Sequence, residues 1–140
     1  MTGYVLDSDH LSLHQRGHES IRKRLLLIPR DRIAVTVVSA EELMRGRLAQ
    51  IRKAIKPEHR LEAYQWLSKT LEFLCGFTVL KFDTGAEAQF QTLRAQKIKI
   101  GTQDLKIAAI SLNQNATLIT RNRRDFEQVP DLKIEDWSIE

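Results

Sequence analysis

Short apolar runs recur along the chain, and each is followed by a longer segment with apolar residues three or four positions apart. Runs rich in valine, isoleucine, leucine and threonine are typical of buried strands. We therefore predict strands at Tyr4–Leu6, Ile33–Val38, Phe77–Leu80 and Ala116–Thr120. A charged segment between Val129 and Trp137 predicts one more short strand, at an edge of the sheet. This alternation predicts an α/β domain with a mostly parallel central sheet of four to five strands, flanked by helices.

The segments between the predicted strands have the spacing of amphipathic helices. We predict helices over about 11–28 with a break near Gly17, over 41–50, 57–74 and 84–96, and from Thr102 to about Asn115. Two pairs match the capping box, in which a hydroxyl and a carboxylate three residues apart bond the first backbone amides: Ser39 with Glu42, and Thr84 with Glu87. Thr102 is placed to cap the last helix.

The 57–74 helix carries one apolar stripe, which is expected to pack in the core: Leu61, Tyr64, Leu67, Leu71 and Leu74. Several basic residues lie near the junction between this helix and the one before it. The alternative to packing in the core is that the two helices form an arm that binds a partner.

The composition predicts one ordered domain over residues 1–140. The chain has 42% apolar and 29% charged residues, with few glycines and prolines, so disorder is not expected. The single cysteine, Cys75, leaves no internal disulfide and suits a reducing compartment. Neither a signal peptide nor an apolar run of about 18 residues is present, so a cytoplasmic protein without a membrane span is expected.

Charge is spread unevenly along the chain. The net charge is +4, yet residues 16–60 contain 12 basic and 5 acidic side chains, a local excess of +7. This excess favours a polyanionic partner such as nucleic acid, or an acidic protein. Solvated helix faces are an equally good explanation of the same charges.

Four acidic side chains occupy comparable places in this plan. Asp7 and Asp125 follow predicted strands, whereas Glu42 and Asp104 lie at the beginning of helices. Ligands in α/β proteins collect beyond the carboxyl ends of the strands, where these groups would meet. Carboxylates that lie so near to one another repel unless a proton or a cation lies between them. Oxygen ligands without clustered Cys or His favour Mg²⁺ or Mn²⁺, which can activate water to attack a phosphodiester.

The positions of Asp7, Glu42 and Asp104 also have a structural explanation. Ser8 or Asp9 could cap a helix directly after Asp7. Glu42 could complete the capping box with Ser39, and Asp104 could offset the dipole of its helix, which is worth about 0.3–1 kcal/mol.

His10, His14 and His18 recur every four residues and would share one face of a continuous helix. A structural zinc site is one interpretation, but Gly17 interrupts the helix and no cysteine accompanies the histidines. Exposed or partly packed histidines are the preferred expectation.

Four segments, in this order and spacing, resemble the PIN-domain ribonucleases, and among them the VapC-type toxins of bacterial toxin–antitoxin pairs. The segments are Y-V-L-D-S-D-H-L-S at 4–12, S-A-E-E-L at 39–43, I-G-T-Q-D-L-K-I-A-A at 100–109, and L-I-T-R-N-R-R-D-F at 118–126, followed by V-P and E-D-W to Trp137. They span nearly the whole chain.

The resemblance implies a metal-dependent endoribonuclease that uses Mg²⁺ or Mn²⁺ and pairs with an antitoxin as a homodimer. Its catalytic and metal-binding quartet maps onto Asp7, Glu42, Asp104 and Asp125, of which the fourth position varies most in the family. We expect Ser8, Thr120 and Asn122 to orient carboxylates or water. Arg121, Arg123 and Arg124 are candidates for contact with RNA phosphates, or are exposed charges without a role. One departure is Asp9, where many members carry Asn; the extra carboxylate either alters metal affinity or is tolerated.

Three other functions compete with this interpretation. One is a PIN nuclease that processes RNA without being a toxin. A second is a haloacid-dehalogenase-type phosphotransferase, which the opening Asp-x-Asp also resembles, with Asp7 as nucleophile, Asp9 as acid and Ser39 as a second motif. No paired acidic motif or convincing lysine completes that pattern. The third is a domain that only binds RNA or protein, which the presence of all four carboxylates disfavours.

Overall fold

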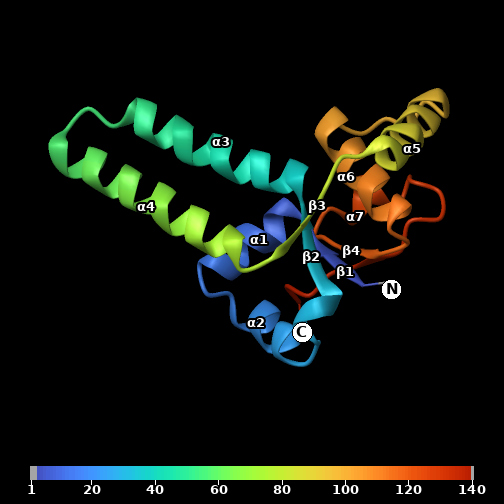
Figure 1. Cartoon of the computed structure of the whole chain (residues 1–140), viewed down its shortest axis with the longest axis horizontal. Coiled ribbons are helices and arrows are strands. Elements are labelled where there is room, and N and C mark those ends of the chain that lie inside the picture. Colours follow the sequence, from blue (N-terminus) through green and yellow to red (C-terminus); the bar gives the residue numbers. More distant parts are fainter. Residues whose placement is uncertain (1–2, 140) are drawn as a thin grey trace.

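The fold was analysed on a computed structural model, which describes residues 3–139. Its sheet has five strands, and every neighbouring pair is parallel. The spatial order is β3-β2-β1-β4-β5, so β1 lies in the centre (Figure 1). The bounds are β1 Tyr4–Leu6, β2 Ile33–Thr36, β3 Thr78–Leu80, β4 Thr117–Ile119 and β5 Ile134–Glu135. The predicted α/β class, the parallel sheet and the short edge strand are confirmed.

Helices connect the strands and cover both faces of the sheet (Figure 1). As expected, the first helical segment is broken near Gly17, whose φ is +86°. None of the helices in the described residues combines the length and the apolar character needed to cross a membrane. The bounds are α1 Ser8–Gln15, α2 Glu19–Leu26, α3 Val37–Lys53, α4 Pro57–Cys75, α5 Thr84–Ala95, α6 Thr102–Asn113 and α7 Arg123–Phe126, with a single 3₁₀ turn at Arg30–Arg32.

The strand register brings three chain segments to one end of the sheet. Leu6, the last residue of β1, pairs with Val35 on one side and with Ile119 on the other. The backbone N–H of Asp7 then donates to the carbonyl of Ile119 at 2.9 Å. The residues that follow β1, β2 and β4 therefore emerge side by side at the carboxyl edge of the sheet.

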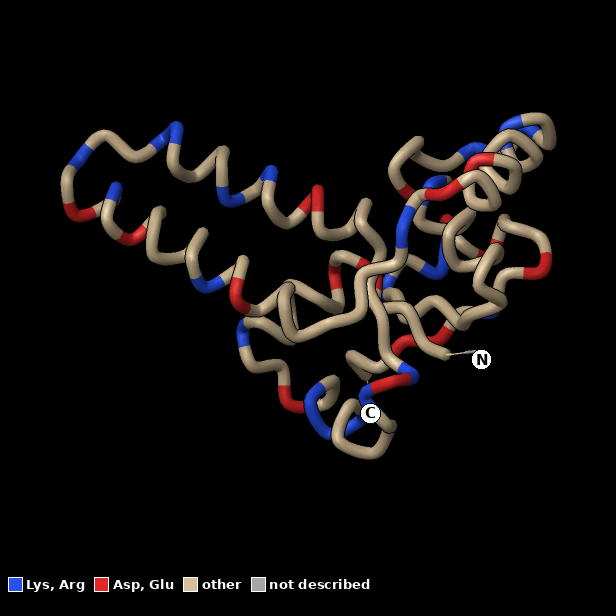
Figure 2. The backbone as a smooth tube through the Cα atoms, in the orientation of Figure 1, with Lys and Arg blue, Asp and Glu red and all other residues tan. Residues whose placement is uncertain are grey.

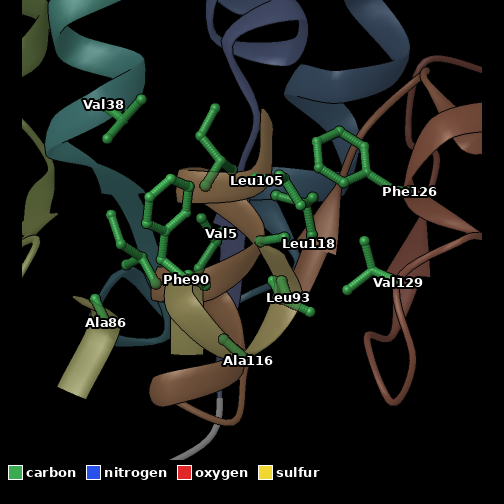
Figure 3. Close-up of a cluster of buried hydrophobic side chains, with 14 residues drawn as sticks. Val5, Val38, Ala86, Phe90, Leu93, Leu105, Ala116, Leu118, Phe126 and Val129 are labelled. Carbon is green, nitrogen blue, oxygen red and sulfur yellow. The ribbon is translucent and has the colours of Figure 1, made fainter. Parts of the chain in front are cut away.

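Alternation along the central strands divides the core between two faces. Val5 and Leu118 point to one face, where they pack against α5, α6 and α7 (Figure 3). Leu6 and Ile119 point to the other, where they pack against α1, α2 and the buried Trp137. Each central strand is thus buried on both faces, which explains why the sequence reads as continuous apolar runs rather than as alternating ones.

The second strand is shorter than predicted because the helix after it begins earlier. β2 ends at Thr36, and Val37 and Val38 already belong to α3. The Thr36 hydroxyl accepts the N–H of Ser39 at 3.0 Å and donates to the Ser39 hydroxyl at 3.2 Å. The predicted capping box of Ser39 with Glu42 is therefore wrong: Thr36 is the N-cap. This leaves Glu42 free of a capping role.

Two further caps differ from their predictions by one residue. Asp83, not Thr84, caps α5, and its carboxylate accepts the N–H of Ala86 at 2.9 Å. Gly101, not Thr102, precedes α6 and makes no side-chain capping bond. Asp104 lies in the first turn of α6, as predicted.

Helices α3 and α4 form a hairpin that reaches away from the sheet (Figure 1). The prediction that the α4 stripe packs in the core is largely wrong: Leu61, Tyr64 and Leu71 are 66%, 53% and 49% exposed, and only Leu74 is buried. Lys and Arg residues are spread along the hairpin, with acidic residues between them (Figure 2). Arg47 is an exception, because it is buried and donates to Thr70 at 2.9 Å.

The position of the α3 cap predicts a difference between two threonines. We expect Thr36→Ala to lower the free energy of unfolding by about 1–2 kcal/mol, because it removes the bond to the Ser39 N–H inside the core. Thr84→Ala is the matched control; Thr84 is exposed and is not a cap, so its loss should change stability by less than about 0.5 kcal/mol. Urea unfolding of both variants measures the difference. Equal losses would contradict the assignment of the cap.

Candidate active site

Asp7 is the most buried of the predicted site carboxylates, with only 5% of its surface exposed. It follows β1 and is itself the N-cap of α1, so neither Ser8 nor Asp9 has the capping role considered above. Its Oδ1 accepts the N–H of Ser8 at 2.8 Å, and its Oδ2 accepts the hydroxyl of Thr120 at 2.8 Å. Both carboxylate oxygens therefore have a fixed donor.

Glu42 is linked to the region around Asp7 through Ser8. The Ser8 hydroxyl donates to Glu42 Oε1 at 2.7 Å, across 34 residues of sequence. Because Thr36 supplies the cap of α3, Glu42 is available to face α1 instead of its own backbone. Ser8 thus uses its N–H for one carboxylate and its hydroxyl for another.

The turn after β4 holds Asp125 in a similar way. Asn122 is the N-cap of α7; its Oδ1 accepts the N–H of Asp125 at 3.4 Å, and its Nδ2 donates to Asp125 Oδ2 at 3.1 Å. The N–H of Asn122 donates to the Thr120 hydroxyl at 3.0 Å. Thr120 therefore connects this turn to Asp7.

Mutual repulsion shows that these carboxylates share one region. Burial, and next the charge of Asp9, raise the pKa of Asp7 from 3.8 to about 7. Burial, and next the charges of Glu42, Asp125 and Asp9, raise the pKa of Asp104 from 3.8 to about 6. The structure therefore brings all four predicted carboxylates together, and it adds Asp9 as a fifth.

The donor chemistry of this cluster fits a hard divalent cation. All five groups are carboxylates, and no basic side chain of the described residues offsets the repulsion at Asp7 or Asp104. As they lie, however, no three acidic, His or Cys side chains of residues 3–139 gather closely enough to enclose a metal ion. A cation between these groups would remove the repulsion that contributes to the raised pKa values of Asp7 and Asp104.

Asp9 was not placed in the predicted quartet, although its spacing from Asp7 was visible in the sequence. Its Oδ1 lies 2.8 Å from His10 Nδ1, and its Oδ2 accepts the N–H of Arg121 at 3.0 Å. The Thr120 hydroxyl also lies 3.4 Å from Asp9 Oδ2. The phosphotransferase alternative needs Asp9 as a free acid, which these contacts disfavour.

The three arginines after β4 are all exposed. Arg123 lies 3.7 Å from Glu127 in an i,i+4 pair on the helix surface. Burial opposes ionisation of Asp136 in the C-terminal segment, but hydrogen bonds from Ser138, helped by the charge of Arg121, hold the pKa of that carboxyl below its usual range. Their proposed contact with RNA phosphates stays a prediction.

Of the three histidines, His14 and His18 are partly packed, as expected, whereas His10 differs from the expectation. His10 is fully buried, whereas His14 is half-buried and lies against Phe73, with 5.7 Å between ring centroids. His18 is the N-cap of α2, and its Nδ1 accepts the N–H of Ile21 at 3.4 Å. The three side chains therefore have three separate environments.

The buried carboxylate predicts a pH-dependent stability for the metal-free chain. Because folding raises the pKa of Asp7 from 3.8 to about 7, the folded state retains a proton that the unfolded state releases. The resulting stability is fully present below about pH 4 and is lost as the pH rises through about 7. The rise in the pKa of Asp7 corresponds to a change of roughly 4 kcal/mol in the free energy of unfolding.

Asp7→Asn should reduce the loss of stability between about pH 4 and 7. This variant should be more stable than the wild type above pH 7, because Asn keeps the helix cap without the charge. Asp83→Asn is the control, since Asp83 caps α5 but is exposed. Urea unfolding over this pH range, with metals removed, is the measurement. A wild-type stability that increases between about pH 4 and 7, or an unchanged fall in Asp7→Asn, would contradict the assignment.

Comparison with known proteins places this geometry in a family. Ribonuclease VapC1 of Haemophilus influenzae (strain R2866) is 30% identical over 137 residues, which cover 96% of this chain and 98% of the relative. The tRNA(fMet)-specific endonuclease VapC of Salmonella typhimurium is 30% identical over 123 residues, 85% of each chain. A crystal structure of VapBC2 from Rickettsia felis, bound to a DNA fragment from their promoter, has a TM-score of 0.78 at 27% identity and covers 96% of this chain and 98% of that one. The PIN domain family matches residues 4–132, and the chain belongs to that family.

Proposed function

We propose that this chain is a metal-dependent endoribonuclease that acts in the cytoplasm as the toxin of a toxin–antitoxin pair. The observation that carries the proposal is the convergence of five carboxylates at the carboxyl edge of the sheet, with the pKa values of Asp7 and Asp104 raised to about 7 and about 6. Relatives named as ribonucleases, aligned over most of the chain, supply the substrate class.

Asp7, Glu42, Asp104 and Asp125 are the residues that would hold Mg²⁺ or Mn²⁺. When bound, the metal supplies Lewis acidity for water activation and for the charge that develops on the phosphate. Ser8, Thr120 and Asn122 hold Glu42, Asp7 and Asp125 in place through the hydrogen bonds described above. Arg121, which follows β4, and Arg124, in α7, are exposed and would attract the RNA backbone.

The proposed partner is an antitoxin protein, which is supported by the similarity to VapBC2 from Rickettsia felis bound to a DNA fragment from their promoter. The proposal also includes a homodimer. The apolar side chains that α4 leaves exposed, Leu61, Tyr64 and Leu71, support an assembly larger than one chain. Sedimentation equilibrium, which should give twice the mass of the chain, checks the dimer.

Cleavage of a mixed cellular RNA pool tests the activity. The purified wild type should cut RNA with Mg²⁺ or Mn²⁺ and should stop when EDTA is added. Asp104→Asn should lower the cleavage rate at least about 100-fold, because it removes one charge from the proposed metal site. Induced expression should arrest the growth of a bacterial host for the wild type but not for this variant.

Asp131→Asn provides the matched control. Asp131 is exposed and has a φ of +67°, a conformation that Asn also adopts, so the same chemical change is made without strain. This variant should cleave RNA like the wild type. If Asp104→Asn remains folded and cuts RNA as fast as Asp131→Asn, the assignment of the site is wrong.

A further inference from the structure

His10 is a fully buried imidazole beside the proposed active site, and both of its nitrogens have partners. Nε2 accepts the backbone N–H of Trp137 at 3.1 Å, and Nδ1 lies 2.8 Å from Asp9 Oδ1. The ring therefore joins the first helix to the C-terminal segment across 127 residues of sequence. None of the roles proposed above uses this contact.

The two partners fix the position of the proton on the ring. A backbone N–H can only donate, so Nε2 must offer its lone pair to Trp137. The proton then lies on Nδ1 and is donated to Asp9. Asp136 Oδ1 is also 3.4 Å from Nε2, but it already accepts both the N–H and the hydroxyl of Ser138.

Asp9 in turn faces donors on both of its oxygens. Oδ1 accepts from His10, and Oδ2 accepts the N–H of Arg121 at 3.0 Å. An asparagine has one acceptor oxygen and one donor NH₂ group, so it could satisfy only one of these two donors. The carboxylate at position 9 and the imidazole at position 10 therefore require one another.

The bond to Arg121 leads back to the reaction centre. It fixes the backbone directly after Thr120, and the Thr120 hydroxyl donates to Asp7 Oδ2 at 2.8 Å. At the other end, Trp137 is anchored by its ring, which is fully buried and packs on Tyr4 with 5.2 Å between centroids. Its carbonyl also accepts the Ser20 hydroxyl at 3.0 Å. The chain of contacts thus runs from a rigid part of the core to Asp7.

We infer that His10 and Asp9 are a positioning pair: His10 holds Asp9 against the turn after β4, and Asp9 fixes the Thr120 hydroxyl on Asp7 without itself binding the metal. This inference rests on the proposed metal-dependent ribonuclease activity. It gives Asp9 a role that differs from that of the quartet, although all five groups are carboxylates.

Two single variants and their combination test the pair. Asp9→Asn and His10→Phe should each lower kcat for RNA cleavage about 10- to 100-fold with little change in KM, and each should weaken Mn²⁺ binding to the same extent. Because both act through one contact chain, the double variant should lose no more than either single variant. His14→Phe is the matched control on the same helix, because His14 Nδ1 has no hydrogen-bond partner among residues 3–139.

The competing result is distinct. If Asp9 were a metal ligand, Asp9→Asn would weaken Mn²⁺ binding as strongly as Asp7→Asn does, while His10→Phe would leave it unchanged; this would overturn the inference. Losses that add in the double variant, or wild-type kinetics in both single variants, would also overturn it. If the wild type itself neither binds Mn²⁺ nor cuts RNA, the proposed function falls, and this inference falls with it.

A measurement on the unmodified protein keeps the inference testable even if His10→Phe fails to fold. Long-range ¹⁵N–¹H NMR of the His10 ring should show the proton on Nδ1 and an unprotonated Nε2. A ring protonated on Nε2 would contradict the pairing with Trp137, whatever the activity of the protein.

Discussion

The structure depends on one electrostatic constraint, which is that a parallel sheet gathers several carboxylates at one edge and buries the most central of them. Asp7 directly follows the middle strand, so folding removes it from water and places it near the charges of Asp9 and Asp104. Burial and like charge both favour the protonated form, which is why the pKa of Asp7 rises to about 7. The proposed metal ion would offset the repulsion between the carboxylates, and the relief of this repulsion would favour metal binding.

The chain holds four of these five like charges with hydrogen bonds, namely those of Asp7, Asp9, Glu42 and Asp125. Ser8, Thr120, Asn122 and the N–H of Arg121 each hold a carboxylate oxygen at 2.7–3.1 Å. These donors come from segments that the sheet register aligns, because Leu6, Val35 and Ile119 lie side by side near the carboxyl ends of three neighbouring strands. The fold and the site therefore depend on the same pairing of strands.

The sequence alone was sufficient to locate the strands and their parallel arrangement and to expect the four carboxylates near one another, because apolar periodicity and strand-end positions are local signals. It was not sufficient for the caps: Thr36 and Ser39, or Asp83 and Thr84, differ by a few residues, and only the backbone path decides which one bonds the free amides. It also could not show that Leu61 and Tyr64 face outward, since an apolar stripe looks the same on a core helix and on a projecting hairpin. The pairing of Asp9 with Arg121 spans 112 residues and has no local signal.

The most direct test of the central claim is the number of protons released when Mn²⁺ binds, measured by calorimetry in buffers of different ionisation enthalpy. If Asp7 and Asp104 titrate near about 7 and about 6, binding near pH 6 should release more than one proton, and the number should fall towards zero above about pH 8. Binding without proton release near pH 6, or no binding at all, would contradict the account of a buried, mutually repelling carboxylate cluster that a cation stabilises.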